Sequence, residues 1–186
     1  MIDVSLKRVE KLISKRMVSN YRTKNLNLVG SKEHREFVSD ISLKCIAWAK
    51  EYCGIKGRIF YLELPKLSDE LKGRVFIEEL RKYNISIVDS INDCDYVVIG
   101  IFSSPKAFSG SINLSDEDKK IVDEIVSSGK KIIGVSFGSP FVFDGYINKF
   151  SGALCCFCDL DEFQLQAAKA IFGNKIYGKM PVRIDE

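Results

Sequence analysis

Short, strongly apolar runs alternate with helical patterns through most of this 186-residue chain. Runs of strand length occur at 58–64 (RIFYLEL), 85–89 (ISIVD), 95–101 (DYVVIGI), 131–137 (KIIGVSF) and 153–158 (ALCCFC). A run such as YVVIGI, apolar at every position, is typical of a strand covered on both faces. Helical patterns follow Ser68, Ser115 and Asp159, and a short helix is expected near 141–149. This alternation predicts an α/β fold: a mostly parallel sheet of about five strands with helices on both faces, in a flavodoxin-like sandwich.

The chain before the first of these runs has a different character. Residues 4–17 place their apolar side chains on one helical face, and a polar stretch without periodicity follows to Gly30. A longer helix is expected from Ser31, which can cap it, because Phe37, Ile41, Cys45 and Trp48 recur at spacings of three or four residues. Gly54 and Gly57 would end that helix. We therefore expect a helix and linker over 1–30 and an α/β domain over 31–186.

Composition excludes several classes of protein. Residues 1–35 hold nine Lys and Arg against three Asp and Glu, whereas the rest holds 19 against 22. A basic arm can bind nucleic acid, but Tyr21 is the only aromatic residue before Phe37, so a solvated helix face and polar linker are favoured over nucleic-acid binding. No apolar run approaches the roughly 20 residues of a membrane span, and residues 1–10 do not resemble a signal peptide. We expect no membrane partner.

The six cysteines favour buried thiols over a disulfide or metal framework. Three of them, Cys155, Cys156 and Cys158, lie in the apolar run 153–158, where alternation places Cys156 and Cys158 on one face and Cys155 on the other. Zinc sites favour C-x₂₋₄-C pairs with a second ligand cluster, and His34 is the only histidine. The sequence therefore predicts no metal, and free thiols are typical of a reducing, cytoplasmic location.

Motifs for nucleotide binding and for self-contained catalysis are missing. No G-x-G-x-x-G turn follows the run 58–64, and neither a Walker-type loop nor a G-x-S-x-G elbow occurs. The acidic groups Asp116–Asp118 and Asp159–Glu162 stand at expected helix starts, where carboxylates complement the helix dipole. We expect no cofactor and no catalytic residue in this chain.

Four segments resemble glycoside hydrolase family 3. The segment 167–184 (AAKAIFGNKIYGKMPVRI) is similar to a closing motif of that family, at Ala167, Ala168, Phe172, Gly173, Gly178, Lys179, Met180, Pro181 and Val182. The segment 130–143 resembles a strand and loop of the family, with Ser139 in place of the usual Asn. Residues 4–17, with Ser5, Arg8 and Val9, resemble the last helix of the catalytic barrel, and 34–51 resembles the helix that opens the second domain. The resemblance is to the C-terminal domain, preceded by the end of a barrel.

This resemblance implies a companion domain whose catalytic barrel belongs to the same polypeptide. In the β-glucosidase-like branch the second domain supplies a glutamate on the loop after a strand matching 95–101, but Phe102–Leu114 holds no Asp or Glu. The sequence is compatible with the β-N-acetylglucosaminidase-like branch, in which the acid/base belongs to a barrel loop. The isolated chain is therefore expected to be inactive, and its parent protein to be a glycoside hydrolase.

Candidate contacts to carbohydrate follow from the sheet rather than from a motif. Ligand clefts of open α/β sheets lie at the carboxyl ends of the strands. Ser103, Ser104, Lys106 and Ser139 stand at such ends and can hydrogen-bond a sugar or a facing barrel loop. Ordinary loop contacts and helix capping also account for these residue types, and we favour that interpretation.

Two other functions stay open. The chain can be a free-standing sugar-binding or interaction module that has lost its barrel, or a different α/β protein in which the motif matches are accidental. The apolar face of residues 4–17 can also pair with a second copy, so homo-oligomerisation through this helix is a further expectation.

Overall fold

A computed structural model describes residues 2–17, 29–52, 54–65, 71–103 and 113–185. The contacts divide the chain into two units, 1–35 and 36–186. The first unit holds helix α1 (Ile2–Met17), which agrees with the predicted N-terminal helix. None of the helices in these described ranges has the length and apolar character needed to cross a membrane.

The second unit is built on one six-stranded sheet. Its strands are β1 (Ala47–Lys50), β2 (Gly57–Leu64), β3 (Ile85–Val88), β4 (Tyr96–Ile101), β5 (Lys131–Ser136) and β6 (Gly152–Cys155). The spatial order is β1-β6-β5-β4-β2-β3, in which only the β1–β6 pair is antiparallel. The five parallel strands are the five predicted apolar runs, and their order corresponds to the 2-1-3-4-5 arrangement of flavodoxin-like folds. The predicted α/β class is confirmed.

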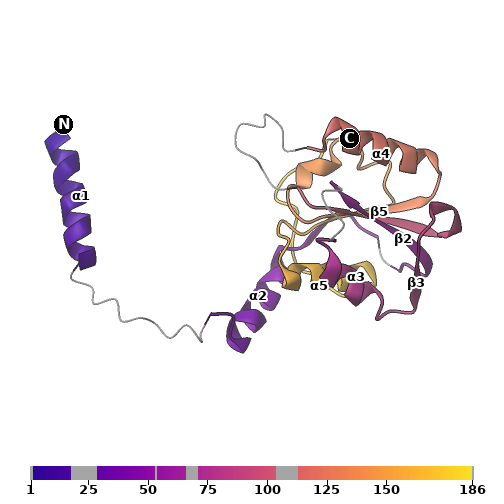
Figure 1. Cartoon of the computed structure of the whole chain (residues 1–186), viewed down its shortest axis with the longest axis horizontal. Helices are drawn as coiled ribbons and strands as arrows, with labels where there is room; N and C mark the ends of the chain where they lie inside the picture. Colours follow the sequence, from indigo (N-terminus) through magenta and orange to yellow (C-terminus); the bar gives the residue numbers. More distant parts are fainter. Residues whose placement is uncertain (1, 18–28, 53, 66–70, 104–112, 186) are drawn as a thin grey trace. The chain divides into compact units, whose positions relative to one another are not determined.

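Helices cover both faces of this sheet, with α4 on one side and α3 and α5 on the other (Figure 1). Helices α3 (Arg74–Leu80) and α5 (Asp161–Ile171) pack with the C-terminal part of α2 (Lys32–Cys45) on one hydrophobic cluster. Helix α4 (Asp116–Ser127) and the 3₁₀ turn Pro140–Phe143 pack on the opposite cluster. A second 3₁₀ turn spans Ile91–Asp93. Because successive side chains of a strand point to opposite faces of the sheet, each central strand contributes side chains to both clusters. Val98 lies in the first cluster and Ile99 in the second.

Local signals at α4 are confirmed. Ser115 caps the helix by accepting a hydrogen bond from the backbone N–H of Asp118, and its hydroxyl donates to the Asp118 carboxylate at 2.7 Å. Gly129 follows the helix with φ of 70°, a left-handed conformation that favours glycine. The buried thiols are also as predicted, with Cys155 in one cluster and Cys156 in the other.

The predicted long helix from Ser31 is wrong in its second half. Helix α2 ends at Cys45, and Trp48 lies instead on β1, which pairs with β6. Ile46, between the two elements, and Ala47, the first residue of β1, are both fully buried. The helical spacing that included Trp48 was accidental, because strand pairing with a segment more than one hundred residues away determines this stretch. The short helix expected near 141–149 is limited to the 3₁₀ turn Pro140–Phe143 and the turns after it.

Candidate carboxyl-end site of the sheet

The strand order reverses between β2 and β4, which is where open α/β sheets form a ligand crevice. The register pairs Leu64 with Ile101, so both strands end at the same level. Backbone bonds extend the ladder one step further, from Phe102 N–H to Leu64 O and from Phe137 N–H to Ile101 O, each at 2.8 Å. The ring of Phe102 stacks on that of Phe137, with centroids 4.5 Å apart. Backbone hydrogen bonds and ring stacking therefore hold the ends of β2, β4 and β5 together at this edge.

Two of the four predicted contact residues meet at this edge. The backbone N–H of Ser139 donates to the hydroxyl of Ser103 at 3.1 Å. The Ser139 hydroxyl accepts from Phe141 N–H, and the Ser139 carbonyl accepts from the Ser136 hydroxyl. A Cβ on Gly138 would overlap the carbonyl oxygen of Ser103, so the ends of β4 and β5 are in backbone contact. Ser104 and Lys106 lie outside the described residues.

A buried carboxylate stands beside this edge, and sequence reasoning did not single it out. Glu63, near the end of β2, is 9% exposed. It accepts hydrogen bonds from the Tyr61 hydroxyl at 3.0 Å, from Lys72 N–H at 2.9 Å, and from Gly73 N–H. The burial of Tyr61, together with the neighbouring Glu63 carboxylate, holds the pKa of Tyr61 well above its usual value. Tyr61 therefore remains a neutral donor at ordinary pH.

Gln164 of α5 completes the same arrangement. It is 3% exposed; its amide oxygen accepts from Phe76 N–H at 3.2 Å, and its amide nitrogen donates to the carbonyls of Lys72 and Asp159. Helix α3 has no side-chain cap of its own, since Gly73 occupies that position. Glu63 and Gln164 therefore supply from β2 and α5 the partners that the start of α3 needs.

This geometry assigns Glu63 an internal role. Its hydrogen bonds from the described residues come from the Tyr61 hydroxyl and from the two backbone N–H groups just before α3, so the carboxylate holds the start of α3 against β2. The available sequence signal was a charged residue inside an otherwise apolar strand end, in YLEL. Across the described ranges, no group of three or more His, Cys, Asp or Glu side chains is arranged to hold a metal ion.

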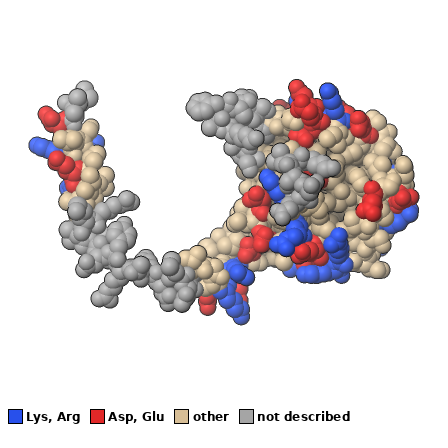
Figure 2. Space-filling model, in the orientation of Figure 1, with Lys and Arg blue, Asp and Glu red and all other residues tan. Residues whose placement is uncertain are grey.

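Charges of both signs are mixed on the visible face of residues 36–186. Figure 2 shows Lys and Arg side chains interleaved with Asp and Glu over the visible face of residues 36–186. Several of these charges pair locally, including Arg58 with Asp95 at 3.6 Å and Lys82 with Glu79 at 2.6 Å. The visible surface of this unit is mixed in sign, and a single-sign field that would steer a nucleic acid is not visible on it.

Comparison with known proteins identifies solved structures of similar fold. No family model matches the sequence, and no curated protein matches it. Among solved structures, a glycoside hydrolase family 3 β-N-acetylglucosaminidase from Paenibacillus sp. str. FPU-7 aligns over 99% of this chain and 39% of its own, with a TM-score of 0.67 and 15% identity. The β-glucoside phosphorylase BglX aligns over 79% of this chain and 31% of its own, with a TM-score of 0.61 and 15% identity. A β-glucosidase from Listeria innocua aligns over 84% of this chain and 27% of its own, with a TM-score of 0.61 and 11% identity.

The fold class of this chain is thus a flavodoxin-like α/β sandwich. More particularly, it has the fold of part of a glycoside hydrolase family 3 enzyme, which confirms at the level of the fold the resemblance predicted from sequence. The chain spans about a third of the length of these structures.

Proposed function

We propose that this chain is the non-catalytic α/β domain of a glycoside hydrolase family 3 type enzyme and packs against a catalytic barrel of the same polypeptide. The observation that carries the proposal is the alignment of 99% of the chain with 39% of a family 3 β-N-acetylglucosaminidase. A chain that matches one part of a larger enzyme from end to end is expected to do the work of that part.

The chemistry of the described residues supports a companion role. Glycoside hydrolysis ordinarily needs two carboxyl groups that flank the scissile bond. Among the described residues near the carboxyl end of the sheet, two carboxylates are buried: Glu63, whose oxygens are engaged by Tyr61 and two backbone N–H groups, and Asp118 at the start of α4, which accepts from the Ser115 hydroxyl. Both are therefore poorly placed to protonate a leaving group. We further propose that Ser103, Ser104, Lys106 and Ser139 contact a sugar or the facing barrel.

The test compares the chain alone with the chain joined to a barrel. Purified chain is incubated with aryl β-N-acetylglucosaminide and aryl β-glucoside, and sugar binding is followed by calorimetry. The companion role predicts no turnover by the chain, and more turnover by a fusion of the chain with a family 3 barrel than by that barrel alone. Turnover by the chain alone would refute the non-catalytic assignment.

The alternative is a free-standing sugar-binding or interaction module without a barrel. It predicts the same lack of turnover but no gain on fusion. Substitution of both Ser103 and Ser139 by Ala provides the matched site variant, and Ser127→Ala on the exposed face of α4 is its control. Loss of sugar binding in the double variant alone would support the proposed contacts, and equal binding by both variants would refute them.

A further inference from the structure

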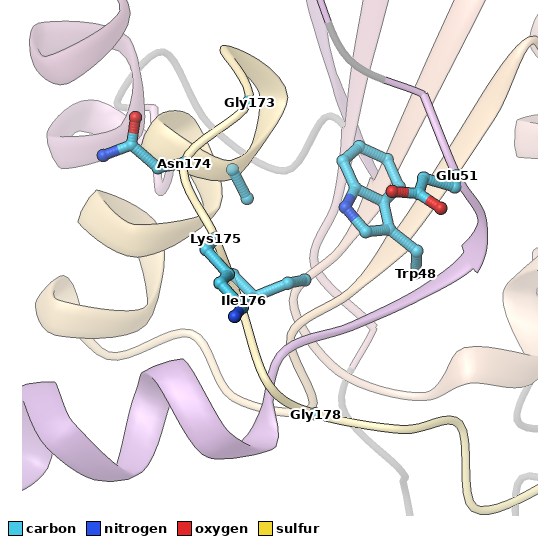
Figure 3. Close-up of a pocket in the computed structure, with 8 residues that line it drawn as sticks. Trp48, Glu51, Gly173, Asn174, Lys175, Ile176 and Gly178 are labelled. Carbon is cyan, nitrogen blue, oxygen red and sulfur yellow. The ribbon is translucent and has the colours of Figure 1, made fainter.

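A cavity lies between β1 and the segment that follows α5. Its volume is about 370 Å³, within the roughly 300–1,000 Å³ of small-molecule pockets. Trp48 and Glu51 line it from β1 and the residues just after β1, and Gly173, Asn174, Lys175 and Gly178 line it from the chain after α5. Figure 3 shows the indole of Trp48 extending toward the Gly173–Gly178 segment, with Glu51 beside it. Trp48 is the only tryptophan in the chain.

The walls of this cavity are held in place by the fold. Strand β1 is paired with β6, and Trp48 packs partly against the hydrophobic cluster on that face of the sheet. The opposite wall is fixed where Tyr177 N–H donates to Leu43 O at 2.8 Å and Asn174 N–H donates to Lys169 O at 3.1 Å. A Cβ on Gly178 would overlap the backbone carbonyls of Cys45 and Ile46, so this segment lies directly against the end of α2. A preformed cavity loses little conformational entropy when it binds a ligand.

Two polar groups beside the cavity have hydrogen-bonding capacity to spare. Among the described residues, neither the indole N–H of Trp48 nor the Glu51 carboxylate has a hydrogen-bond or ion-pair partner, whereas the Asn174 side chain points away from Trp48 (Figure 3). Lys175 places its ammonium over the ring of Tyr177 at 5.1 Å. The lining thus combines donors and acceptors with one acidic and one basic side chain, so its formal charges balance.

We propose that this cavity binds a neutral saccharide ring, with Trp48 as the apolar platform and Glu51 and Lys175 as partners of the hydroxyl groups. A pyranose has an apolar face of C–H groups and a rim of hydroxyls, and each hydroxyl both donates and accepts hydrogen bonds. An indole ring with a carboxylate and an ammonium group beside it complements that shape and polarity. Balanced charge disfavours phosphate and carboxylate ligands, which would require a surplus of cations. This site is separate from Ser103 and Ser139, and the proposal for it does not depend on the presence of a barrel.

The single tryptophan provides a direct readout. Its fluorescence is followed while N-acetylglucosamine, N,N′-diacetylchitobiose or glucose is added into the tens of millimolar, with mannitol as the open-chain control and adenosine as a flat heteroaromatic control. A saturable change with at least one of the three cyclic sugars, absent with mannitol, is expected. No saturable change with any cyclic sugar, or saturation by adenosine alone, would overturn the proposal.

Variants distinguish a loss of sugar binding at this site from a general loss of structure. Glu51→Gln alters an exposed side chain and should weaken sugar binding by about threefold to tenfold, the effect of one weakened hydrogen bond. Glu124→Gln is the matched control at an exposed position elsewhere and should bind as the unchanged protein does. Equal affinity in the site variant and the control would refute this placement. Ser103→Ala with Ser139→Ala should leave the fluorescence titration unchanged, which distinguishes a failure here from a failure of the proposed function.

Discussion

Replacement of Glu63 by Gln tests how the start of α3 is held. The carboxylate accepts from Tyr61, Lys72 and Gly73, and a glutamine side chain keeps only one acceptor oxygen. Its new NH₂ group would face N–H or O–H donors, so at least one buried donor loses its partner. Hydrogen bonds to a charged group contribute about 1.5–3 kcal/mol each, and an unpartnered buried donor costs about 1–3 kcal/mol. We expect Glu63→Gln to lower the free energy of unfolding by about 2–4 kcal/mol.

Urea denaturation followed by circular dichroism measures this loss, and thermal unfolding provides a second estimate. For a domain of about 150 residues each kcal/mol corresponds to about 2–4 °C in Tm, so a fall of about 4–16 °C is expected. Glu78→Gln makes the same chemical change on the exposed face of α3 and should stay within about 0.5 kcal/mol of the unchanged protein. If Glu63→Gln were as stable as Glu78→Gln, the carboxylate would not be anchoring the helix and the reasoning would fail.

Two further predictions concern the buried thiols and the strand ends. Burial raises the pKa of Cys155 from 9.0 to about 12 and also raises that of Cys156, so an unfolded chain loses these protons first as the pH rises. The contribution of these two protonated thiols to the free energy of unfolding is complete below pH 9. Above pH 9 it declines by about 1.4 kcal/mol per pH unit for each thiol until the folded-state pKa is reached. Urea titrations at pH 8 and pH 10 should therefore give different midpoints, and equal midpoints would contradict the burial of these groups. In Gly138→Ala the new methyl group would overlap the Ser103 carbonyl, so the free energy of unfolding should fall by about 1–3 kcal/mol. Changes in amide NMR shifts should be confined to the ends of β4 and β5. An unchanged Tm would show that the two ends are not in contact.

Sequence patterns were sufficient for the parallel part of the sheet. The five apolar runs each became a strand, because a segment apolar at successive positions is stable only when both faces are covered. Ser115 and Gly129 likewise marked the ends of α4, since capping depends on residues within one turn of the helix. The placement of Ser103 beside Ser139 followed from the rule that parallel strands end at a common edge.

The tertiary structure decided what depends on distant partners. Local spacing placed Trp48 on a helix, but pairing of β1 with β6 made it a strand residue that lines a cavity with Asn174 and Lys175. Sequence reasoning singled out neither Glu63 nor Gln164, and both bond the backbone of Lys72 only because β2 and α5 each approach the start of α3. Helix periodicity and caps act over a few residues, so the sequence alone can determine them. Strand pairing, buried hydrogen-bond partners and cavities join residues a hundred positions apart, and only the folded chain brings them together.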